Sequence, residues 1–452
     1  MSPSILRYSR MTHAADILRD RRRGLPGSFV GRIALVASAA LALRLLYILV
    51  IARAPVGVGG DAGFYHSAAN LIAQGRFYDR GIFGQAYVTA EHPPLYPLLL
   101  SVVSLAGGDT LLAHRIVGCV VGAGAVGLIG LLGREVMGER AGLLAASIAA
   151  VYPPLVTADG LVMSEPLFVL AVVVALLLAG RLIAAPTFAR AAVLGAVVGL
   201  ATLTRGEGLA LLPLLAWPAA FAPARGRALR VTAASVATLA VLAPWVIRNA
   251  VVLHRLTLAT DASTLIAGAN CRDTYYGHDI GWWSPGCLAR SRTRAQLDAG
   301  DASIAAGVRY AGAHLTRLPL VGVVRALRTF DLFQPLRQGN HERRRRWVDI
   351  AGLAFYYPLL GLASFGLVRL RGARPRGARP PTASSRPSAL LLAPVWMVLI
   401  VSVLGWGIGR FRVGADASLI VLAAVALTPR PASLNPAPST RSRPLRVRAS
   451  GG

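Results

Sequence analysis

The sequence predicts an all-α integral membrane protein with about ten transmembrane helices, and three observations support this. Hydrophobic residues make up 55% of the 452 residues and charged residues only 15%, against roughly 25% charged residues in soluble domains. Apolar stretches close to the ~20 residues that a helix needs to cross ~30 Å of hydrocarbon recur along nearly the whole chain. Arginines cluster in alternate short connections between these stretches. Together these features argue against a soluble globular protein.

Ten apolar stretches are the candidate spans. The fifth, sixth and tenth are short for a full crossing, so we expect each to be tilted, re-entrant or bounded a few residues too narrowly. The first lies behind a long basic tail and is predicted to act as a signal anchor. In chain order the stretches are residues 33–51, 116–132, 141–158, 167–184, 191–203, 209–221, 231–251, 348–368, 390–404 and 415–427.

The charge distribution predicts the orientation of the chain. The net charge is +28, and because the chain contains no lysine, all 48 basic residues are arginines. Short cytoplasmic connections are enriched in basic residues, which predicts that both termini are cytoplasmic and that the acidic connections lie outside. One basic run, 343–346, falls on the external side, but it belongs to a long loop, where this rule is weaker. The basicity therefore reports topology and does not indicate nucleic-acid binding.

These patterns divide the chain into five predicted parts. A Pro/Arg/Gly-rich cytoplasmic linker at 371–388 interrupts the fourth part. We expect two surface helices in the external loop 52–115 and an amphipathic helix at 317–333. The parts are a basic tail at 1–32, a membrane module at 33–252, an extracytoplasmic loop at 253–347, C-terminal transmembrane helices at 348–428 and a basic tail at 429–452.

The extracytoplasmic loop holds two cysteines and a pair of tryptophans. Cys271 and Cys287 either form a disulfide, which the oxidising side of the membrane permits, or remain two free thiols. Trp282 and Trp283 suit lipid headgroups, a sugar ring or a purely structural role. The sequence leaves both questions open.

Ionisable residues gather at the predicted outer ends of the helices. A membrane bundle keeps such groups only where something offsets their desolvation, so they are functional candidates. A carboxylate among several guanidiniums can take a proton from an acceptor hydroxyl while the arginines hold an anionic phosphate leaving group. Single arginines at helix ends, however, also serve as lipid-headgroup anchors. The set comprises Asp61, Tyr65, Glu91, His92, Arg115, Asp159, Glu165, Arg205, Glu207, Arg248, Arg410 and Arg412.

Several of these residues lie in motifs that resemble the GT-C superfamily of glycosyltransferases, which includes protein O-mannosyltransferases, core galacturonosyltransferases and aminoarabinose transferases. The strongest part is Gly60-Asp61-Ala62-Gly63-Phe64-Tyr65 after the first span, followed some thirty residues later by Glu91-His92-Pro93-Pro94-Leu95. Weaker matches are Ser164-Glu165-Pro166, Thr204-Arg205-Gly206-Glu207-Gly208, Pro244-Trp245-Val246-Ile247-Arg248-Asn249 and Gly409-Arg410-Phe411-Arg412.

The resemblance implies a GT-C-like fold and a reaction at the extracytoplasmic face. Asp61 would act as general base, an envelope acceptor (protein, glycan or lipid) would attack the anomeric carbon, and polyprenyl phosphate would leave with inversion. Many relatives have Asp-Glu where this chain has Asp61-Ala62, so a second catalytic carboxylate is not expected in that pair. His92 occupies a position where relatives with aminoarabinose donors often have lysine. The resemblance assigns donor-phosphate or substrate binding to Tyr65, Glu91, His92, Glu165, Arg205, Arg248, Arg410 and Arg412.

The predicted chemistry requires no cofactor and no nucleotide. The chain lacks the Asp-x-Asp metal motif of many nucleotide-sugar transferases, and a Walker A loop is impossible without lysine. Glu91 and His92 could hold a divalent metal ion, but two ligands do not make a site. The predicted partners are a polyprenyl-phosphate sugar donor, an envelope acceptor and the lipid bilayer, and no nucleic acid.

Other interpretations stay open at this stage. A polytopic transporter or flippase for an anionic lipid-linked sugar would also use arginines, although the sequence shows no inverted repeat with broken helices. A noncatalytic scaffold would leave Asp61 dispensable. Asp61 and Glu165 would each also suit a helix N-terminus. The donor sugar, the acceptor, the polyprenol length and the oligomeric state are not determined by the sequence.

Overall fold

The structure, a computed structural model, describes residues 27–53, 60–78, 89–221, 225–290, 300–337, 346–372 and 387–429, and every regular element within them is a helix. The predicted all-α class is confirmed. The predicted basic tails, the linker at 371–388 and the basic run at 343–346 lie almost entirely outside the described residues.

The first half of the chain holds most of the candidate membrane spans. Several helices begin where a hydroxyl caps free backbone N–H groups: the side chains of Ser28, Thr110 and Thr187 accept hydrogen bonds from the third residue after each. Two of the helices are separated by Gly138, whose φ of +87° suits glycine. The elements are α2 (Phe29–Leu46) with η1 (Tyr47–Ile51), α5 (Leu111–Met137), α6 (Glu139–Val151), α7 (Pro153–Asp159), α8 (Glu165–Ala184), α9 (Phe188–Thr204), η2 (Gly206–Ala210), η3 (Leu212–Ala216), α10 (Trp217–Phe221) and α11 (Arg227–Leu253).

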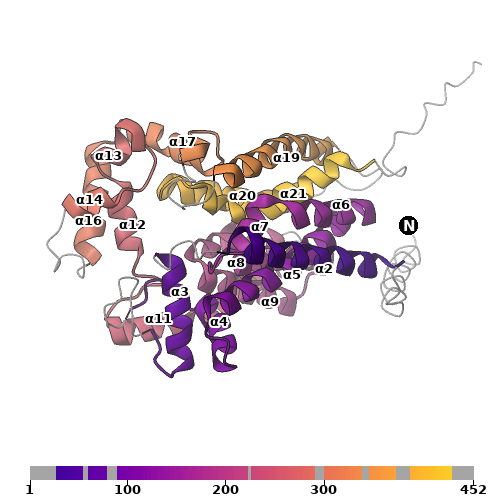
Figure 1. Cartoon of the computed structure of the whole chain (residues 1–452), viewed down its shortest axis with the longest axis horizontal. Helices are drawn as coiled ribbons and strands as arrows, with labels where there is room; N and C mark the ends of the chain where they lie inside the picture. The colour runs from indigo at the N-terminus through magenta and orange to yellow at the C-terminus, as the bar shows by residue number, and fades with distance from the viewer. Residues whose placement is uncertain are drawn as a thin grey trace, which may run out of the picture.

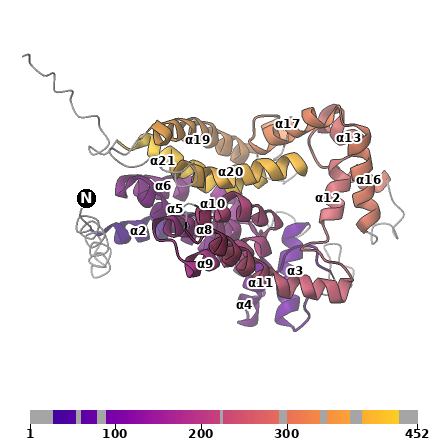
Figure 2. The same cartoon turned by 180° about the vertical axis from the view of Figure 1, so that it is seen from behind.

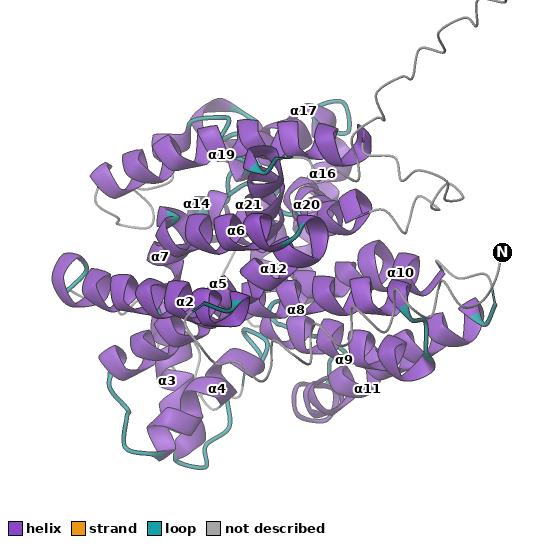
Figure 3. Ribbon diagram, turned by 90° about the vertical axis from the view of Figure 1, so that its right-hand side faces the viewer, coloured by secondary structure: helices purple, strands orange, loops and turns teal. Residues whose placement is uncertain are grey.

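The second half adds a group of shorter helices from α12 to α17, called the α12–α17 segment below, and the helices α19, α20 and α21. Figures 1 and 3 show α19, α20 and α21 on one side of α2, α5, α8 and α9, and α21 contacts α5, α6 and α8. At the end of the molecule opposite the start of α2, the helices α12, α13 and α16 lie beside one another, as the rear view in Figure 2 also shows. The elements are α12 (Ala262–Ala269), α13 (Arg272–Tyr275), η4 (Gly277–Asp279), α14 (Pro285–Arg290), α16 (Gly300–Ala313), α17 (Leu318–Thr329), α19 (Arg346–Gly372), α20 (Pro387–Leu404), η6 (Gly409–Arg412) and α21 (Val413–Leu427).

Six helices in the described part of the chain are long and apolar enough to cross a membrane, and a bent pair raises the number to seven. The pair is α6 with α7, which meet at 59°. These seven coincide with the predicted spans other than the fifth, sixth and tenth. Those three fall on shorter apolar helices, α9 with 17 residues, 206–221, and α21 with 15. Ten crossings are therefore not shown, and the shortfall lies in the three stretches that the sequence marked as short.

Two helix pairs pack at very close range. A Cβ atom on Gly195 of α9 would collide with the carbonyl oxygen of Ala234 in α11, and one on Gly366 of α19 would collide with that of Leu422 in α21. Small residues allow helix backbones to approach closely, and the resulting van der Waals packing contributes to helix association within a bilayer.

A buried ion pair holds α2 against the bent pair. Arg44 is fully buried, and its Nε lies 2.6 Å from Oδ2 of Asp159. Its Nη1 donates to the carbonyl oxygens of Ala40 and Ala150 at 3.2 and 3.1 Å. A buried guanidinium needs such partners to offset desolvation. Asp159 thus serves α2 and is not part of the outer polar cluster.

The amphipathic helix predicted at 317–333 is present as α17, but its arginines point inward. Arg325 and Arg328 are each 1% exposed, whereas Leu320 and Val323 are 45% and 56% exposed. The arginines donate to backbone oxygens of the surrounding segments, including those of Ala269, Ile280 and Val403. Because other segments supply hydrogen-bond acceptors, the arginines of α17 point into the protein and some of its apolar side chains point outward.

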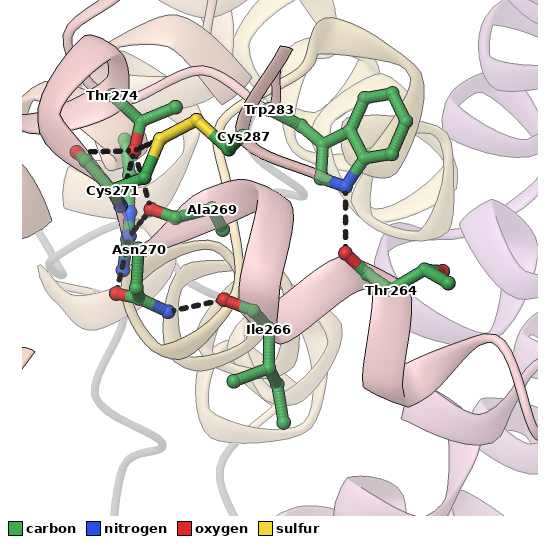
Figure 4. Close-up of a disulfide and its surroundings, with 9 residues drawn as sticks. Thr264, Ile266, Ala269, Asn270, Cys271, Thr274, Trp283 and Cys287 are labelled. Atoms are coloured by element: carbon green, nitrogen blue, oxygen red, sulfur yellow. Dashed lines mark hydrogen bonds between the residues drawn. A yellow bond between two sulfur atoms is a disulfide. The ribbon is translucent and has the colours of Figure 1, made fainter. Parts of the chain in front are cut away.

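The α12–α17 segment contains a disulfide between Cys271 and Cys287, whose Cα atoms are 6.1 Å apart (Figure 4). Beside it the Nε1 of Trp283 donates to the Thr264 carbonyl oxygen at 3.1 Å, and Trp282 is 5% exposed. Trp282 is therefore buried and Trp283 is hydrogen-bonded within the segment, while binding of headgroups or of a sugar by these indoles stays untested.

Candidate active site

Asp61 is the first residue of α3 (Asp61–Ala73). The residue before it, Gly60, has φ +68° and ψ −152°, a conformation that favours glycine. Gly60 occupies the N-cap position and no side chain caps the helix. Asp61 is therefore not the helix cap that the sequence left open, and its carboxylate is turned toward other side chains.

Asp61 and Glu165 share one guanidinium. Arg410, in η6, places Nη2 2.7 Å from Asp61 Oδ2 and donates from Nε to Glu165 Oε1. The η6 turn follows α20, so residues almost 350 positions apart meet here. The predicted proximity of these three residues is reproduced by the structure.

A second guanidinium approaches Glu165 from the end of α9. Arg205 Nη1 lies 2.9 Å from Glu165 Oε1, and its Nε donates to Glu207 Oε1. The Glu165 side chain is 3% exposed, while those of Asp61 and Arg410 are 30% and 28% exposed. Glu165 is thus a buried anchor for two arginines, and the Asp61–Arg410 pair remains accessible.

His92 lies on the other side of Asp61, just before α4 (Leu95–Leu105). Its Nε2 is 3.6 Å from Asp61 Oδ1, and its Nδ1 is 3.3 Å from Oδ2 of Asp261. The ring stacks on Tyr65, with centroids 5.1 Å apart. Asp261 was not predicted: it belongs to no motif, and no local pattern in the sequence connects it with His92.

The charge state of the site follows from these contacts. Burial raises the pKa of Asp61, but Arg410 and His92 outweigh burial, and the net pKa lies far below its usual range. Burial lowers the pKa of His92, but Tyr65, Asp261 and Asp61 outweigh it, and the net pKa lies well above its usual value. Burial also raises the pKa of Tyr65. Near neutral pH the site therefore combines a carboxylate, an imidazolium and a neutral phenol.

Two other predicted site residues, Tyr65 and Arg248, contact the segments that carry Glu165 and His92. Tyr65 is buried, and its hydroxyl donates to Ser164 Oγ at 3.2 Å, next to Glu165. Arg248 at the end of α11 donates from Nη1 to the Thr89 carbonyl oxygen at 2.8 Å and lies over the Trp245 ring. Arg248 thus holds the segment that carries Glu91 and His92.

Arg412 lies in a separate buried cluster. Its side chain is 4% exposed and pairs with Asp331, with Asp416 at 3.1 Å, and with the face of the Tyr356 ring, whose centroid is 3.6 Å away. The structure does not bring Arg412 to Asp61, and two carboxylates already occupy its guanidinium. This placement suits a role in holding the η6 turn, and the predicted role of Arg412 in binding the donor phosphate stays untested.

No group of three or more His, Cys, Asp or Glu side chains is arranged to hold a metal ion within the described residues. Both ring nitrogens of His92 face aspartate oxygens. Metal binding at Glu91 and His92 stays an untested prediction.

Residues 91–248, about a third of the chain, match the protein family described as dolichyl-phosphate-mannose-protein mannosyltransferase. The predicted resemblance is confirmed. The matched segment is that of a glycosyltransferase family and contains His92, Glu165, Arg205 and Arg248, whereas Asp61 and Arg410 lie outside it. No curated protein sequence matches the chain.

Solved structures are similar in fold at low sequence identity. The apo oligosaccharyltransferase of Archaeoglobus fulgidus has a TM-score of 0.50 and 17% identity, covering 90% of this chain and 51% of its own. AglB of the same organism, in complex with an inhibitory peptide and a dolichol-phosphate, has a TM-score of 0.49 and 17% identity, covering 88% and 50%. ArnT from Cupriavidus metallidurans bound to undecaprenyl phosphate has a TM-score of 0.44 and 16% identity, covering 88% and 78%. The chain spans about half the length of the archaeal enzymes.

Proposed function

We propose that this chain is a membrane glycosyltransferase that moves a sugar from a polyprenyl-phosphate donor to a hydroxyl of an envelope acceptor, with Asp61 as general base. The observation that carries the proposal is the accessible Asp61–Arg410 pair, 2.7 Å apart, anchored on the buried Glu165. It lies against a segment that matches a mannosyltransferase family. An accessible carboxylate beside a guanidinium offers a proton acceptor and a phosphate-binding group in one place.

The reaction transfers one proton and exchanges one bond at the anomeric carbon. Asp61 takes the proton of the acceptor hydroxyl while the acceptor oxygen attacks that carbon. The bond from the carbon to the phosphate oxygen breaks, and polyprenyl phosphate leaves with the electron pair. Attack opposite the leaving group inverts the sugar configuration. Arg410 and Arg205 supply positive charge as negative charge grows on the leaving oxygen.

Donor binding would also adjust the basicity of Asp61. In the free site the pair with Arg410 holds the pKa of Asp61 low, so the carboxylate is ionised but a weak base. A donor phosphate competes with Asp61 for Arg410, since guanidinium binds phosphate bidentately. When Arg410 turns to the phosphate, Asp61 loses its counter-ion and its proton affinity rises. The base would thus be strengthened when the donor is in place.

The topology belongs to the same proposal. We place the site on the extracytoplasmic face and both termini in the cytoplasm, with ten crossings in which α9, the 206–221 segment and α21 are tilted or re-entrant. The arginine-rich connections support this orientation. A glycine-to-cysteine accessibility scan with a membrane-impermeant thiol reagent would test it, and labelling of Gly107→Cys from the cytoplasm would contradict it.

The test of the proposal is sugar transfer by membranes that contain the native chain, Asp61→Asn or the control Asp279→Asn, with radiolabelled polyprenyl-phosphate-mannose and polyprenyl-phosphate-arabinose. Asp279 pairs with Arg337 away from the site. Loss of a general base lowers the rate roughly 10²- to 10⁴-fold, so Asp61→Asn should collapse while Asp279→Asn keeps native activity. Equal activity in all three would remove Asp61 as the base. No transfer by the native chain from either donor, with transbilayer movement of the lipid, would favour a flippase.

A further inference from the structure

Asp261 faces the site but has no part in the proposed reaction. It is the N-cap residue of α12, and its Oδ2 lies 3.3 Å from His92 Nδ1, on the opposite side of the imidazole from Asp61. His92 is therefore held between two carboxylates from different external segments. The question is what this arrangement does to the imidazole.

The segment that carries Asp261 is fixed by hydrogen bonds on both sides. The Trp245 indole donates to the Leu258 carbonyl oxygen at 2.8 Å, and the Asn249 amide donates to that of Thr257 at 2.9 Å. The Thr260 amide donates to the Ala90 carbonyl oxygen at 2.9 Å. These hydrogen bonds connect the residues before Asp261 to α11 and to the residues just before His92. The backbone therefore holds the Asp261 and His92 side chains close to each other.

The imidazole is also fixed. Its ring stacks on Tyr65 and meets Phe64 edge-on at 5.0 Å between centroids. The Tyr78 hydroxyl donates to the His92 carbonyl oxygen at 3.1 Å, which holds the backbone. In this orientation Nδ1 faces Asp261 and Nε2 faces Asp61.

Two carboxylates around one imidazole favour its doubly protonated form. A neutral imidazole has one N–H and one lone pair, so it would present the lone pair to one of the carboxylates. An imidazolium presents an N–H to each and gains the attraction of both charges. The titratable groups that face the ring are Asp61 and Tyr65 from α3 and Asp261 from α12, with Glu91 adjacent in the chain. Within the part of the chain that the structure describes, the charged groups that face the ring nitrogens are the carboxylates of Asp61 and Asp261, and both favour the cation.

We propose that Asp261 is a positioning residue that keeps His92 as an imidazolium, so that His92 provides a second cation, beside Arg410, for the phosphate of the donor. The role of the cation rests on the proposed function, whereas the charge state of His92 does not. When a phosphate enters and draws Arg410 from Asp61, His92 stays charged because Asp261 remains its partner. Without Asp261, the charge of His92 would depend on Asp61 alone.

The kinetic test compares the native chain with Asp261→Asn, which keeps the shape and an acceptor oxygen but removes the charge, and with Asp279→Asn as the matched control. His92 is charged below its folded pKa, so activity that needs the imidazolium is present at low pH and lost as pH rises. In Asp261→Asn the alkaline limb of kcat/KM should move to lower pH by about one unit or more. The donor KM near pH 8 should rise roughly tenfold. Near pH 5.5 the variant should approach native activity, a recovery that a merely structural lesion would not show.

A second variant tests whether Asp261→Asn acts through the charge of residue 92 or by disturbing the structure in general. His92→Lys carries a cation that stays charged over this range, so Asp261→Asn combined with His92→Lys should lose the shifted limb. Persistence of the shift would overturn the proposal. Loss of activity on chelation, restored by a divalent metal ion, would also overturn it, because an imidazolium cannot ligate a metal.

The charge of His92 can be measured without turnover. NMR of the full chain in detergent, with histidine rings labelled and His92 assigned through His92→Gln, should show His92 titrating at higher pH than an exposed histidine, with a lower midpoint in Asp261→Asn. An unmoved midpoint overturns the inference whatever the activity. A lowered midpoint in a protein that transfers no sugar supports the role of Asp261 and rejects the proposed function, so the two failures are distinguishable.

Discussion

Arg410 and Arg412 are two residues apart in the η6 turn, and each pairs with two carboxylates, yet their surroundings differ. The Arg410 side chain is 28% exposed and meets Asp61, which is 30% exposed. The Arg412 side chain is 4% exposed and meets Asp416, which is fully buried. One turn therefore carries an open ion pair and a closed one.

The difference between these clusters is whether a partner can be exchanged. Water and an incoming phosphate can reach the open pair, and a phosphate oxygen can replace a carboxylate oxygen at little desolvation cost. In the closed cluster, removal of any partner leaves a charge in a low-dielectric environment, which is costly. Exposure, and not the number of partners, separates an arginine that can bind substrate from one that holds the fold.

The largest expected effect breaks the open cluster. Arg410→Gln should lower the rate of sugar transfer roughly 10²- to 10³-fold, as expected when one donor to a developing negative charge is lost. Its thermal unfolding in detergent should stay close to native, because Asp61 can be hydrated and the buried Glu165 keeps Arg205 as its cationic partner. The control is Arg337→Gln, which removes an exposed arginine whose partner Asp279 is also exposed. Native activity of Arg410→Gln would show that the exposed Arg410 is no more important for transfer than the buried Arg412.

The next effect breaks the closed cluster. Arg412→Gln leaves Asp416 and Asp331 without their cation, and loss of one partner of a buried pair costs about 3–5 kcal/mol of unfolding free energy. Denaturation in detergent would measure this loss. The fraction that stays folded should retain the donor affinity of the native chain. A stable Arg412→Gln protein that fails to bind donor would instead return Arg412 to the phosphate site.

The smallest expected effect is the loss of an ion pair that is more exposed than the Asp61–Arg410 pair. Arg32 and Glu139 form a pair at 3.0 Å with side chains 43% and 46% exposed. Exposed pairs contribute about 0–1 kcal/mol, so Arg32→Gln should lower the unfolding free energy by no more than that. The same denaturation experiment applies, and a loss as large as that of Arg412→Gln would show that exposure is not the controlling variable.

Local sequence patterns were sufficient for the helices and for much of the site. Hydropathy located all the long apolar helices, and the motifs named Asp61, His92, Glu165 and Arg410 before their proximity was known. They could not separate Arg410 from Arg412, because the two share one motif and the direction of each side chain is set by the turn. Asp261 was missed because its contact with His92 joins residues 169 positions apart through loop geometry.

The same limit applies to α17. Its periodicity predicted a helix, but the inward direction of Arg325 and Arg328 depends on backbone oxygens contributed by other segments. Long-range acceptors are invisible in a local pattern, which is why burial of the arginines could not be predicted.

The hydrogen bonds that hold α17 against other segments have a consequence for the design of chimeric proteins. Arg325 donates to oxygens of Ala269 and Val403, and the Gly407 amide donates to the Gly281 carbonyl oxygen at 2.9 Å. These hydrogen bonds join the α12–α17 segment to the end of α20, just ahead of the turn that carries Arg410. A chimera that imports the α12–α17 segment from a relative would therefore have to import the end of α20 and the η6 turn with it to keep these bonds.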